Sequence, residues 1–320
     1  MHDTIGSVMV KPLVSIIIPT YNRANVLARS IYSVLNQTYN EIEVIVVDDS
    51  STDSTIEIIT GINDPRLKLI RLPINSGPSA ARNAGIKAST GEYIAFQDSD
   101  DEWFEEKLEK QMHYLGHAIT NDNRVAACYS RYLQTFKGKK QVFPPGQSAD
   151  LSGSIYESLL YKNKISPTTL LIRKKALDDV GYFDETLNKL EDWDLALRIA
   201  ARFHIAFLDE VTVVVHDSFG SVNKLISPES ELAILQKHLI PFRSTPEAFA
   251  IITCSIVLEY AKQGNKREAT KFLKMSLERY VGSQKPPLCA AISLCVKLFL
   301  ALLSVRRTLK PLLPKLPIWK

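Results

Sequence analysis

Short apolar runs alternate with helix-like segments along the first third of the chain. Four runs rich in β-branched or aromatic side chains predict buried strands, at residues 14–19, 42–47, 67–72 and 93–96. Between them, apolar residues recur with helical spacing at 25–35, 55–60 and 79–87. This alternation predicts an α/β fold built from βαβ units, with a mainly parallel sheet covered by helices on both faces.

Polar residues follow three of these strands at the point where each strand ends. They form the sequences Thr20-Tyr21-Asn22-Arg23, Asp48-Asp49-Ser50 and Asp98-Ser99-Asp100. Ligands of parallel sheets bind at the carboxyl ends of the strands, which lie along one edge. We therefore expect the three polar sequences to line one pocket.

The alternation becomes less regular after residue 104 and gives way to helices near the C-terminus. The elements expected within 125–215 predict a smaller mixed region packed on the parallel half. Ser227-Pro228-Glu229 is a typical helix start, and residues 252–263 and 266–280 predict a helical hairpin. The predicted domains are a sheet-containing domain at 11–222, divided into two halves (11–103 and 104–222), and a helical extension with a basic tail at 227–320.

Composition narrows the class of protein without naming a function. A formal charge of +4 in 320 residues is too small and too spread out to indicate nucleic-acid binding. The four cysteines show no Cys-x-x-Cys spacing, and residues 1–11 lack the pattern of a signal peptide. A reduced, cytoplasmic location is the resulting expectation.

The C-terminal tail raises the question of membrane contact. Residues 288–305 are almost wholly apolar but include Lys297, and a run of basic residues follows, at Arg306, Arg307, Lys310, Lys315 and Lys320. A spanning helix needs about 20 apolar residues, so the run is marginal for crossing a bilayer. Two alternatives stay open for this segment. It could attach peripherally to anionic lipid on the cytoplasmic face, or it could dock on the 11–222 domain or on a partner chain. The sequence does not indicate the oligomeric state.

The acidic cluster after residue 96 is the first candidate for chemistry. Asp98, Asp100 and Asp101 crowd the end of a predicted strand, where like charges repel unless a cation neutralises them. Mg²⁺ takes one or two protein carboxylates and completes its shell with water and phosphate oxygens. The alternative is a solvated turn.

Other candidates resemble parts of a nucleotide site. Tyr21 can stack on a base, Asp49 can accept a hydrogen bond from a base N–H, and Arg82 can bind a diphosphate. The alternatives are a half-buried loop tyrosine, a helix cap and a structural arginine.

Two further residues suit catalysis and metal binding. Asp192 could act as a general base on an acceptor hydroxyl, with Trp193 as an apolar wall; its alternative is a helix-dipole partner. His216 could complete a metal shell through its imidazole, or be an ordinary loop histidine.

Together these sequences resemble the ordered motif set of family 2 glycosyltransferases. The resemblance covers about residues 11–222 and rests on Val14-Ser-Ile-Ile-Ile-Pro-Thr-Tyr-Asn-Arg23, Val46-Val-Asp-Asp-Ser50, Gly77-Pro-Ser-Ala-Ala-Arg-Asn-Ala-Gly85, Gly91-Glu-Tyr-Ile-Ala-Phe-Gln-Asp-Ser-Asp-Asp101 and Glu191-Asp192. It implies the A-type glycosyltransferase (GT-A) fold, a nucleotide-sugar donor, a carbohydrate or glycolipid acceptor, a Mg²⁺ or Mn²⁺ cofactor and inversion at the anomeric carbon.

The resemblance also implies a role for each matching residue. Nucleotide contacts fall on Pro19, Thr20, Tyr21, Asn22, Arg23, Asp48, Asp49, Arg82, Asp98 and Ser99. The metal falls on Asp100, with a looser match at His216, and the base is Asp192. Asp101, Glu191 and Trp193 fall in the acceptor or sugar pocket. The family favours a uridine nucleotide, while thymidine and guanosine donors stay open.

One departure and two alternatives limit this interpretation. Processive members carry Gln-x-x-Arg-Trp after the base, whereas Asp192 is followed by Trp-Asp-Leu-Ala-Leu-Arg198, so we expect addition of one or a few sugars. A nucleotidyltransferase would show a Gly-rich loop after the first strand, and a dinucleotide oxidoreductase would show Gly-x-Gly-x-x-Gly there. Neither pattern is present, and a protein that only binds nucleotide sugars is the remaining alternative.

Overall fold

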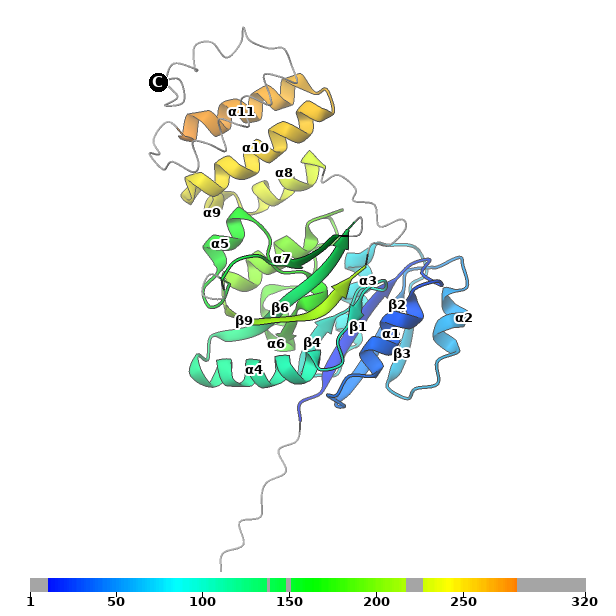
Figure 1. Cartoon of the computed structure of the whole chain (residues 1–320). Helices are drawn as coiled ribbons and strands as arrows, with labels where there is room; N and C mark the ends of the chain where they lie inside the picture. The colour runs from blue at the N-terminus through cyan, green and yellow to red at the C-terminus, as the bar shows by residue number, and fades with distance from the viewer. Residues whose placement is uncertain (1–10, 137–138, 148–150, 217–226, 281–320) are drawn as a thin grey trace, which may run out of the picture. The chain divides into compact units, whose positions relative to one another are not determined.

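The computed structural model describes residues 11–136, 139–147, 151–216 and 227–280. Contacts divide the chain into two compact units (Figure 1). The first unit holds the sheet and comprises residues up to 155 together with 164–185 and 191–218. The second comprises 156–163, 186–190 and the C-terminal region from 219. The predicted boundary between residues 222 and 227 stays a prediction, since the second unit also takes in two short earlier segments.

Four parallel strands form the N-terminal half of the sheet, as the alternating pattern predicts. They are β1 (Val14–Thr20), β2 (Ile42–Asp48), β3 (Leu67–Arg71) and β4 (Tyr93–Phe96). The connecting helices are α1 (Leu27–Leu35), α2 (Thr55–Thr60) and α3 (Pro78–Ala88). Every residue of β1 and β2 is buried, which explains why their sequences are mostly apolar and not alternating. The polar residues inside them, Ser15 and Glu43, are hydrogen-bonded to one another.

The second half extends the same sheet with mixed strand directions. The sheet order is β3-β2-β1-β4-β8-β6-β9-β5, and β7 pairs with β6. The added strands are β5 (Glu102–Trp103), β6 (Val125–Phe136), β7 (Lys139–Phe143), β8 (Leu171–Arg173) and β9 (His204–Val215). β8 runs antiparallel to β4 and β6, while β6 and β9 are parallel. The strands within 125–215 are therefore part of one continuous mixed sheet, and not of a separate region packed on the parallel half.

Helices of the second half complete this unit. They are α4 (Lys107–Asn121), α6 (Lys174–Val180) and α7 (Glu191–Ala200), with a 3-10 turn at Pro167–Thr169.

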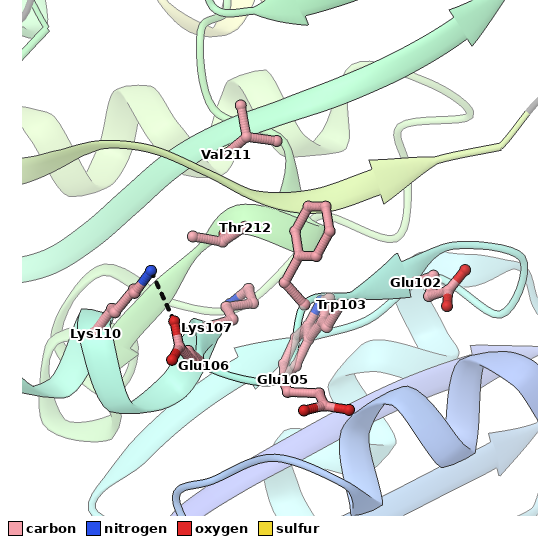
Figure 2. Close-up of a pocket in the computed structure, with 9 residues that line it drawn as sticks. Glu102, Trp103, Glu105, Glu106, Lys107, Lys110, Val211 and Thr212 are labelled. Atoms are coloured by element: carbon pink, nitrogen blue, oxygen red, sulfur yellow. Dashed lines mark ion pairs between the residues drawn. The ribbon is translucent and has the colours of Figure 1, made fainter.

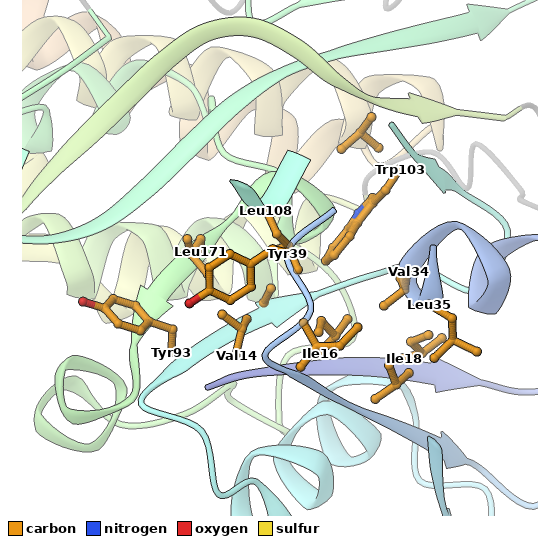
Figure 3. Packing of buried hydrophobic residues seen from close by; sticks show 14 of the residues in the cluster. Val14, Ile16, Ile18, Val34, Leu35, Tyr39, Tyr93, Trp103, Leu108 and Leu171 are labelled. Atoms are coloured by element: carbon orange, nitrogen blue, oxygen red, sulfur yellow. The ribbon is translucent and has the colours of Figure 1, made fainter. Parts of the chain in front are cut away.

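The core beside β1 shows what holds the sheet to its helices. Val14, Ile16 and Ile18 project from one face of β1 into a cluster with α1 and α4 (Figure 3). On the other face α3 lies so close that a Cβ on Gly85 would meet Ile17 Cγ2 at 2.4 Å. Only glycine allows this close approach of α3 to β1.

The second unit is helical, as expected. It contains α5 (Tyr156–Tyr161), α8 (Pro228–Lys237), α9 (Leu239–Ser244), α10 (Pro246–Lys262) and α11 (Lys266–Tyr280). Ser227 caps α8 by accepting a hydrogen bond from the Ser230 N–H at 3.3 Å, and the turn between α10 and α11 uses Gly264 at φ +75°. Tyr260 stacks on Phe272 across the predicted hairpin.

In the part of the chain that the structure describes, no helix combines the length and apolarity needed to cross a bilayer. The predicted membrane or docking segment at 288–305 and the basic tail lie outside the described residues.

Candidate active site

The polar ends of β1, β2 and β4 come together at one edge of the sheet, as predicted. The Asn22 N–H donates to Ser51 Oγ at 2.9 Å, and the Thr52 N–H donates to the Asn22 side chain at 2.8 Å, so the loops after β1 and β2 are joined. The Arg23 guanidinium lies 3.8 Å from a carboxylate oxygen of Asp100 after β4. Tyr21 beside them is 43% exposed, which leaves its ring accessible for stacking.

The two acids at the end of β2 also support the loops structurally. The fully buried Asp48 carboxylate accepts hydrogen bonds from the Ser51 N–H. Both oxygens of Asp49 accept from the start of α3, from the N–H of Ser76 at 2.7 Å and of Gly77 at 2.8 Å. Each carboxylate oxygen can accept a second bond, so contact with a nucleotide stays a prediction for both acids.

Arg82 joins the acidic loop after β4 to the helix that carries Asp192. Its side chain is 7% exposed and donates to Asp98 Oδ1 at 2.9 Å and to Glu191 Oε1 at 3.0 Å. The ring of Phe183 lies 5.2 Å from the guanidinium carbon. A single cation therefore holds two carboxylates that are far apart in the sequence.

The segment around Phe183 is itself fixed from two sides. On α3, the Asn83 amide exchanges hydrogen bonds with the backbone of Phe183 at 2.9 and 3.0 Å. On α7, Arg198 pairs with Asp194 at 2.9 Å and donates to the carbonyls of residues 180–182. Of the three acids in the first turn of α7, Glu191 and Asp194 thus pair with arginines. Asp192 lies between these two acids in the sequence.

Asp192 occupies an environment that favours its neutral form. Burial raises the pKa of its carboxyl to about 7, and the charge of Glu191 adds to the shift, while Arg82 opposes it. One oxygen accepts a hydrogen bond from the Trp193 N–H at 2.8 Å. A carboxylate with a pKa near neutrality is a stronger base than an ordinary aspartate and is still ionised in part at pH 7. Trp193 itself is buried, so its place in an acceptor pocket stays a prediction.

Negative charge accumulates along the loop of residues 98–102, which we call the acid loop. Burial, followed by the charges of Asp98 and Asp100, raises the pKa of the Asp101 carboxyl well above its usual range. The His216 N–H donates to Asp101 Oδ1 at 3.2 Å, and the His216 ring lies 3.2 Å from a carboxylate oxygen of Glu102. In the described ranges no three His, Cys, Asp or Glu side chains converge to enclose an ion. This donor set fits a hard cation that takes one or two carboxylates and obtains its other ligands from substrate phosphate and water.

Helix α1 holds the backbone of the acid loop, a feature that sequence reasoning missed. Ser30 Oγ donates to the carbonyl of Asp98 at 2.9 Å, and an Arg29 N–H donates to that of Asp100 at 2.6 Å. Just beyond the loop, Ser33 accepts from the Trp103 N–H at 3.1 Å, and Gln37 donates to the Phe104 carbonyl at 2.8 Å. We call these four side chains, three on α1 and Gln37 just after its end, the loop clamp. Their spacing along α1, beside its apolar face, was the signal available in the sequence.

The loop clamp leads to a first prediction. Ser30→Ala removes the donor to Asp98 while leaving the carboxylates themselves intact. Because a lost hydrogen bond of this kind costs about 1 kcal/mol, we expect the KM for the donor to rise several-fold and kcat to change less. Steady-state kinetics with varied donor measures this. Asn36→Ala, exposed at the end of the same helix, is the control, and equal KM values for the two variants would contradict the role of the clamp.

A cavity of about 590 Å³ lies next to the acid loop without including the predicted site residues (Figure 2). Its walls come from residues 102–107 and from Lys110, Val211 and Thr212. Lys110 forms ion pairs with Glu106 at 2.9 Å and Glu210 at 2.8 Å. The cavity is therefore separate from the ion pairs that Arg82 forms with Asp98 and Glu191.

Comparison with known proteins places the chain in a family. Residues 15–181 match the family model described as glycosyl transferase family 2. The chain belongs to this family. The matched range includes β1, the acid loop and Arg82, so the resemblance stated from the motifs is confirmed.

Three relatives illustrate the range of similarity. The chain is 47% identical over 121 residues, 37% of its length, to an uncharacterized glycosyltransferase of Haemophilus influenzae, and the match spans only 48% of that relative. It is 33% identical over 192 residues to the UDP-Glc:alpha-D-GlcNAc-diphosphoundecaprenol beta-1,3-glucosyltransferase WfaP of Escherichia coli, covering 59% of this chain and 71% of the relative. With the succinoglycan biosynthesis protein ExoO of Rhizobium meliloti, identity is 29% over 274 residues, 82% of this chain and 76% of the relative.

Among solved structures, this family 2 chain resembles S. aureus TarS. The TarS 1–349 fragment in complex with UDP-GlcNAc superimposes with a TM-score of 0.62 at 21% identity, covering 91% of this chain and 89% of that one. At this identity the similarity establishes the fold, which is the mixed α/β architecture expected from the sequence.

Proposed function

We propose that this protein is an inverting glycosyltransferase that moves a sugar from a nucleotide-sugar donor to an acceptor hydroxyl. The observation that carries the proposal is the bridge through Arg82, which holds Asp98 of the acid loop and Glu191 beside Asp192 on one guanidinium. In such a reaction the donor and the acceptor are bound side by side. The donor site and the base must therefore lie close enough to act on the same pair of substrates. The bridge brings the candidates for both to one place.

In the proposed reaction, Asp192 removes the proton from the acceptor hydroxyl as its oxygen attacks the anomeric carbon. The leaving nucleotide departs from the opposite face, so a single displacement inverts the configuration and no protein nucleophile is needed. Asp49 and Tyr21 would hold the base of the nucleotide. Arg82 would keep the acid loop and α7 at a fixed separation while the proton moves to Asp192.

A Mg²⁺ or Mn²⁺ ion fits the acid loop. Asp100, with Asp98 nearby and His216 as a second predicted ligand, would hold the ion, which when bound supplies charge neutralisation for the leaving diphosphate. The support for this is the concentration of carboxylates on the loop, where burial and then the charges of Asp98 and Asp100 raise the pKa of Asp101.

A UDP-sugar donor and a lipid-linked or polysaccharide acceptor are the proposed substrates. The donor and acceptor for which the E. coli relative is named, and the succinoglycan role of the R. meliloti relative, support this choice. We place the reaction at the cytoplasmic face of the membrane, with the basic tail as a peripheral anchor. Flotation of the full chain with anionic liposomes tests that location, and a chain that stays with the soluble fraction would exclude it.

Nucleotide binding is the experiment that tests the function. We expect calorimetry to show preference for one UDP-sugar in the presence of Mn²⁺ and a marked loss of affinity with a chelator. If the preference for one UDP-sugar persisted with the chelator, the metal would not be required for donor binding, but the proposed donor would still stand. Binding without sugar transfer to any acceptor would favour a nucleotide-sugar-binding protein, and absence of nucleotide binding would overturn the proposed function.

The pKa of Asp192 predicts the pH dependence of the reaction. Its value of about 7 lies above that of a free aspartate, so the carboxyl is mainly protonated, and inactive as a base, below neutral pH. We therefore expect kcat/KM, which reports groups of the free enzyme, to rise as the pH increases through about 7 and then to level off. A series of kinetic measurements from about pH 5 to 9 tests this. A profile already level at pH values near 5 would show that another group controls the rate.

A further inference from the structure

Two histidines face one another on the exposed side of α4, outside the candidate active site. His113 and His117 are one helical turn apart, and both side chains are exposed. Their Nε2 atoms are 3.2 Å apart, and their rings meet edge to face with centroids separated by 4.6 Å. Residues at i and i+4 are neighbours on a helix surface, so the backbone itself holds the two imidazoles together.

The separation of the two nitrogens matches that of two ligands on one metal ion. Zinc binds histidine nitrogen at about 2.0–2.1 Å in tetrahedral geometry, which places two ligand nitrogens about 3.3–3.4 Å apart. The His113 and His117 Nε2 atoms therefore need to move by only a small amount to share an ion. Without metal, one ring donates its N–H to the other, and an ion would take the place of that proton.

The rest of α4 provides a rigid support for this pair. Leu108, Gln111 and Leu115 are buried beneath the helix, and Gln111 donates to the Thr169 carbonyl at 2.8 Å. One turn before His113, Glu109 is paired with Lys11 at 3.2 Å, so this carboxylate already has a cationic partner. Since no third ligand-type side chain joins the pair in the described ranges, water would complete the shell of a bound ion.

We propose that His113 and His117 form a two-histidine site for a single Zn²⁺, Ni²⁺ or Cu²⁺ ion. The chemistry differs from that of the acid loop, because imidazole nitrogen suits these ions whereas carboxylate oxygen suits Mg²⁺ and Mn²⁺. The site is independent of the proposed function and would persist in a catalytically inactive variant.

The test is a Zn²⁺ titration of the full chain by calorimetry, with excess Mg²⁺ present to occupy oxygen-rich sites. We expect His113→Gln and His117→Gln each to lower the affinity about tenfold or more, because each removes half of the protein ligands, and the double variant to lose this site. His238→Gln, which removes a histidine from the helical unit, is the matched control. With Cu²⁺, paramagnetic resonance should show two nitrogen ligands in the wild type and one in each single variant.

Two results would overturn the proposal. One is zinc binding that is equally strong in the double variant and in the wild type, because the ion would then be held elsewhere. The other is a wild-type chain that shows no measurable zinc binding. Because both histidines are exposed, neither substitution should disturb folding, and circular dichroism of the variants checks this.

Discussion

Asp192→Asn should abolish sugar transfer while leaving donor binding almost unchanged. The asparagine keeps the oxygen that accepts from the Trp193 N–H but cannot take a proton from the acceptor. Because a positioned general base contributes about 10²–10⁴-fold to a rate, we expect kcat to fall by about 10³-fold or more. The substitution also removes a charge that burial and Glu191 disfavour, so the variant should be at least as stable as the wild type at pH 8. Single-turnover kinetics and nucleotide calorimetry measure the two effects separately.

Two neighbouring acids provide controls for this result. Asp194→Asn lies two residues further along α7 but weakens a structural pair with Arg198, so it should lower stability more than it lowers the rate. Asp179→Asn, at an exposed position on α6, should change neither quantity. If the Asp192→Asn protein retained wild-type kcat, Asp192 could not be the base, although the nucleotide site would stand.

Arg82→Ala should cause the largest loss of stability among the site residues. It leaves Asp98 and Glu191 without their shared cation in a region that already holds excess negative charge. Removing one partner of a buried ion pair typically costs about 3–5 kcal/mol, and because Asp98 is partly exposed we expect about 3 kcal/mol here. Chemical denaturation followed by tryptophan fluorescence gives the difference in the free energy of unfolding.

The geometry of Arg82 makes the lysine variant informative. Arg82→Lys keeps the positive charge but lacks the planar fork that reaches two carboxylates at once. We expect it to recover only part of the lost stability. Arg202→Ala, at an exposed arginine on the turn after α7, should cost little. If Arg82→Ala and Arg202→Ala had the same free energy of unfolding, the bridge would be of no energetic importance.

The strands and the position of the site could be predicted from the sequence for a physical reason. Strands buried on both faces are mostly apolar, so β1 and β2 stand out as apolar runs that end abruptly in polar residues. Parallel strands place those ends along one edge, which brings Asn22, Asp49 and Asp98 into one region. This prediction of the position of the site depends only on the N-terminal half of the sheet.

The partners within the site could not be predicted in the same way. Which acids Arg82 binds depends on the packing of α7 and on the 180–183 segment, and these are set by long-range contacts such as that of Asn83 with Phe183. β9 begins at His204, earlier than the apolar run at 211–215 indicates, because its first residues pair with β6. The contacts of Asp49 depend on packing in the same way. The sequence allows a helix cap, but it does not show that the N–H groups come from Ser76 and Gly77 at the start of α3.

The loop clamp has a consequence for how this protein could change its substrate. Its hydrogen bonds go to main-chain atoms of residues 98–104, which every amino acid other than proline possesses in the same form. Substitutions of the loop's side chains therefore leave these clamp bonds in place while altering the groups that the loop presents. Such an arrangement lets evolution, or a designer, diversify the chemistry of the loop without rebuilding the scaffold that carries it.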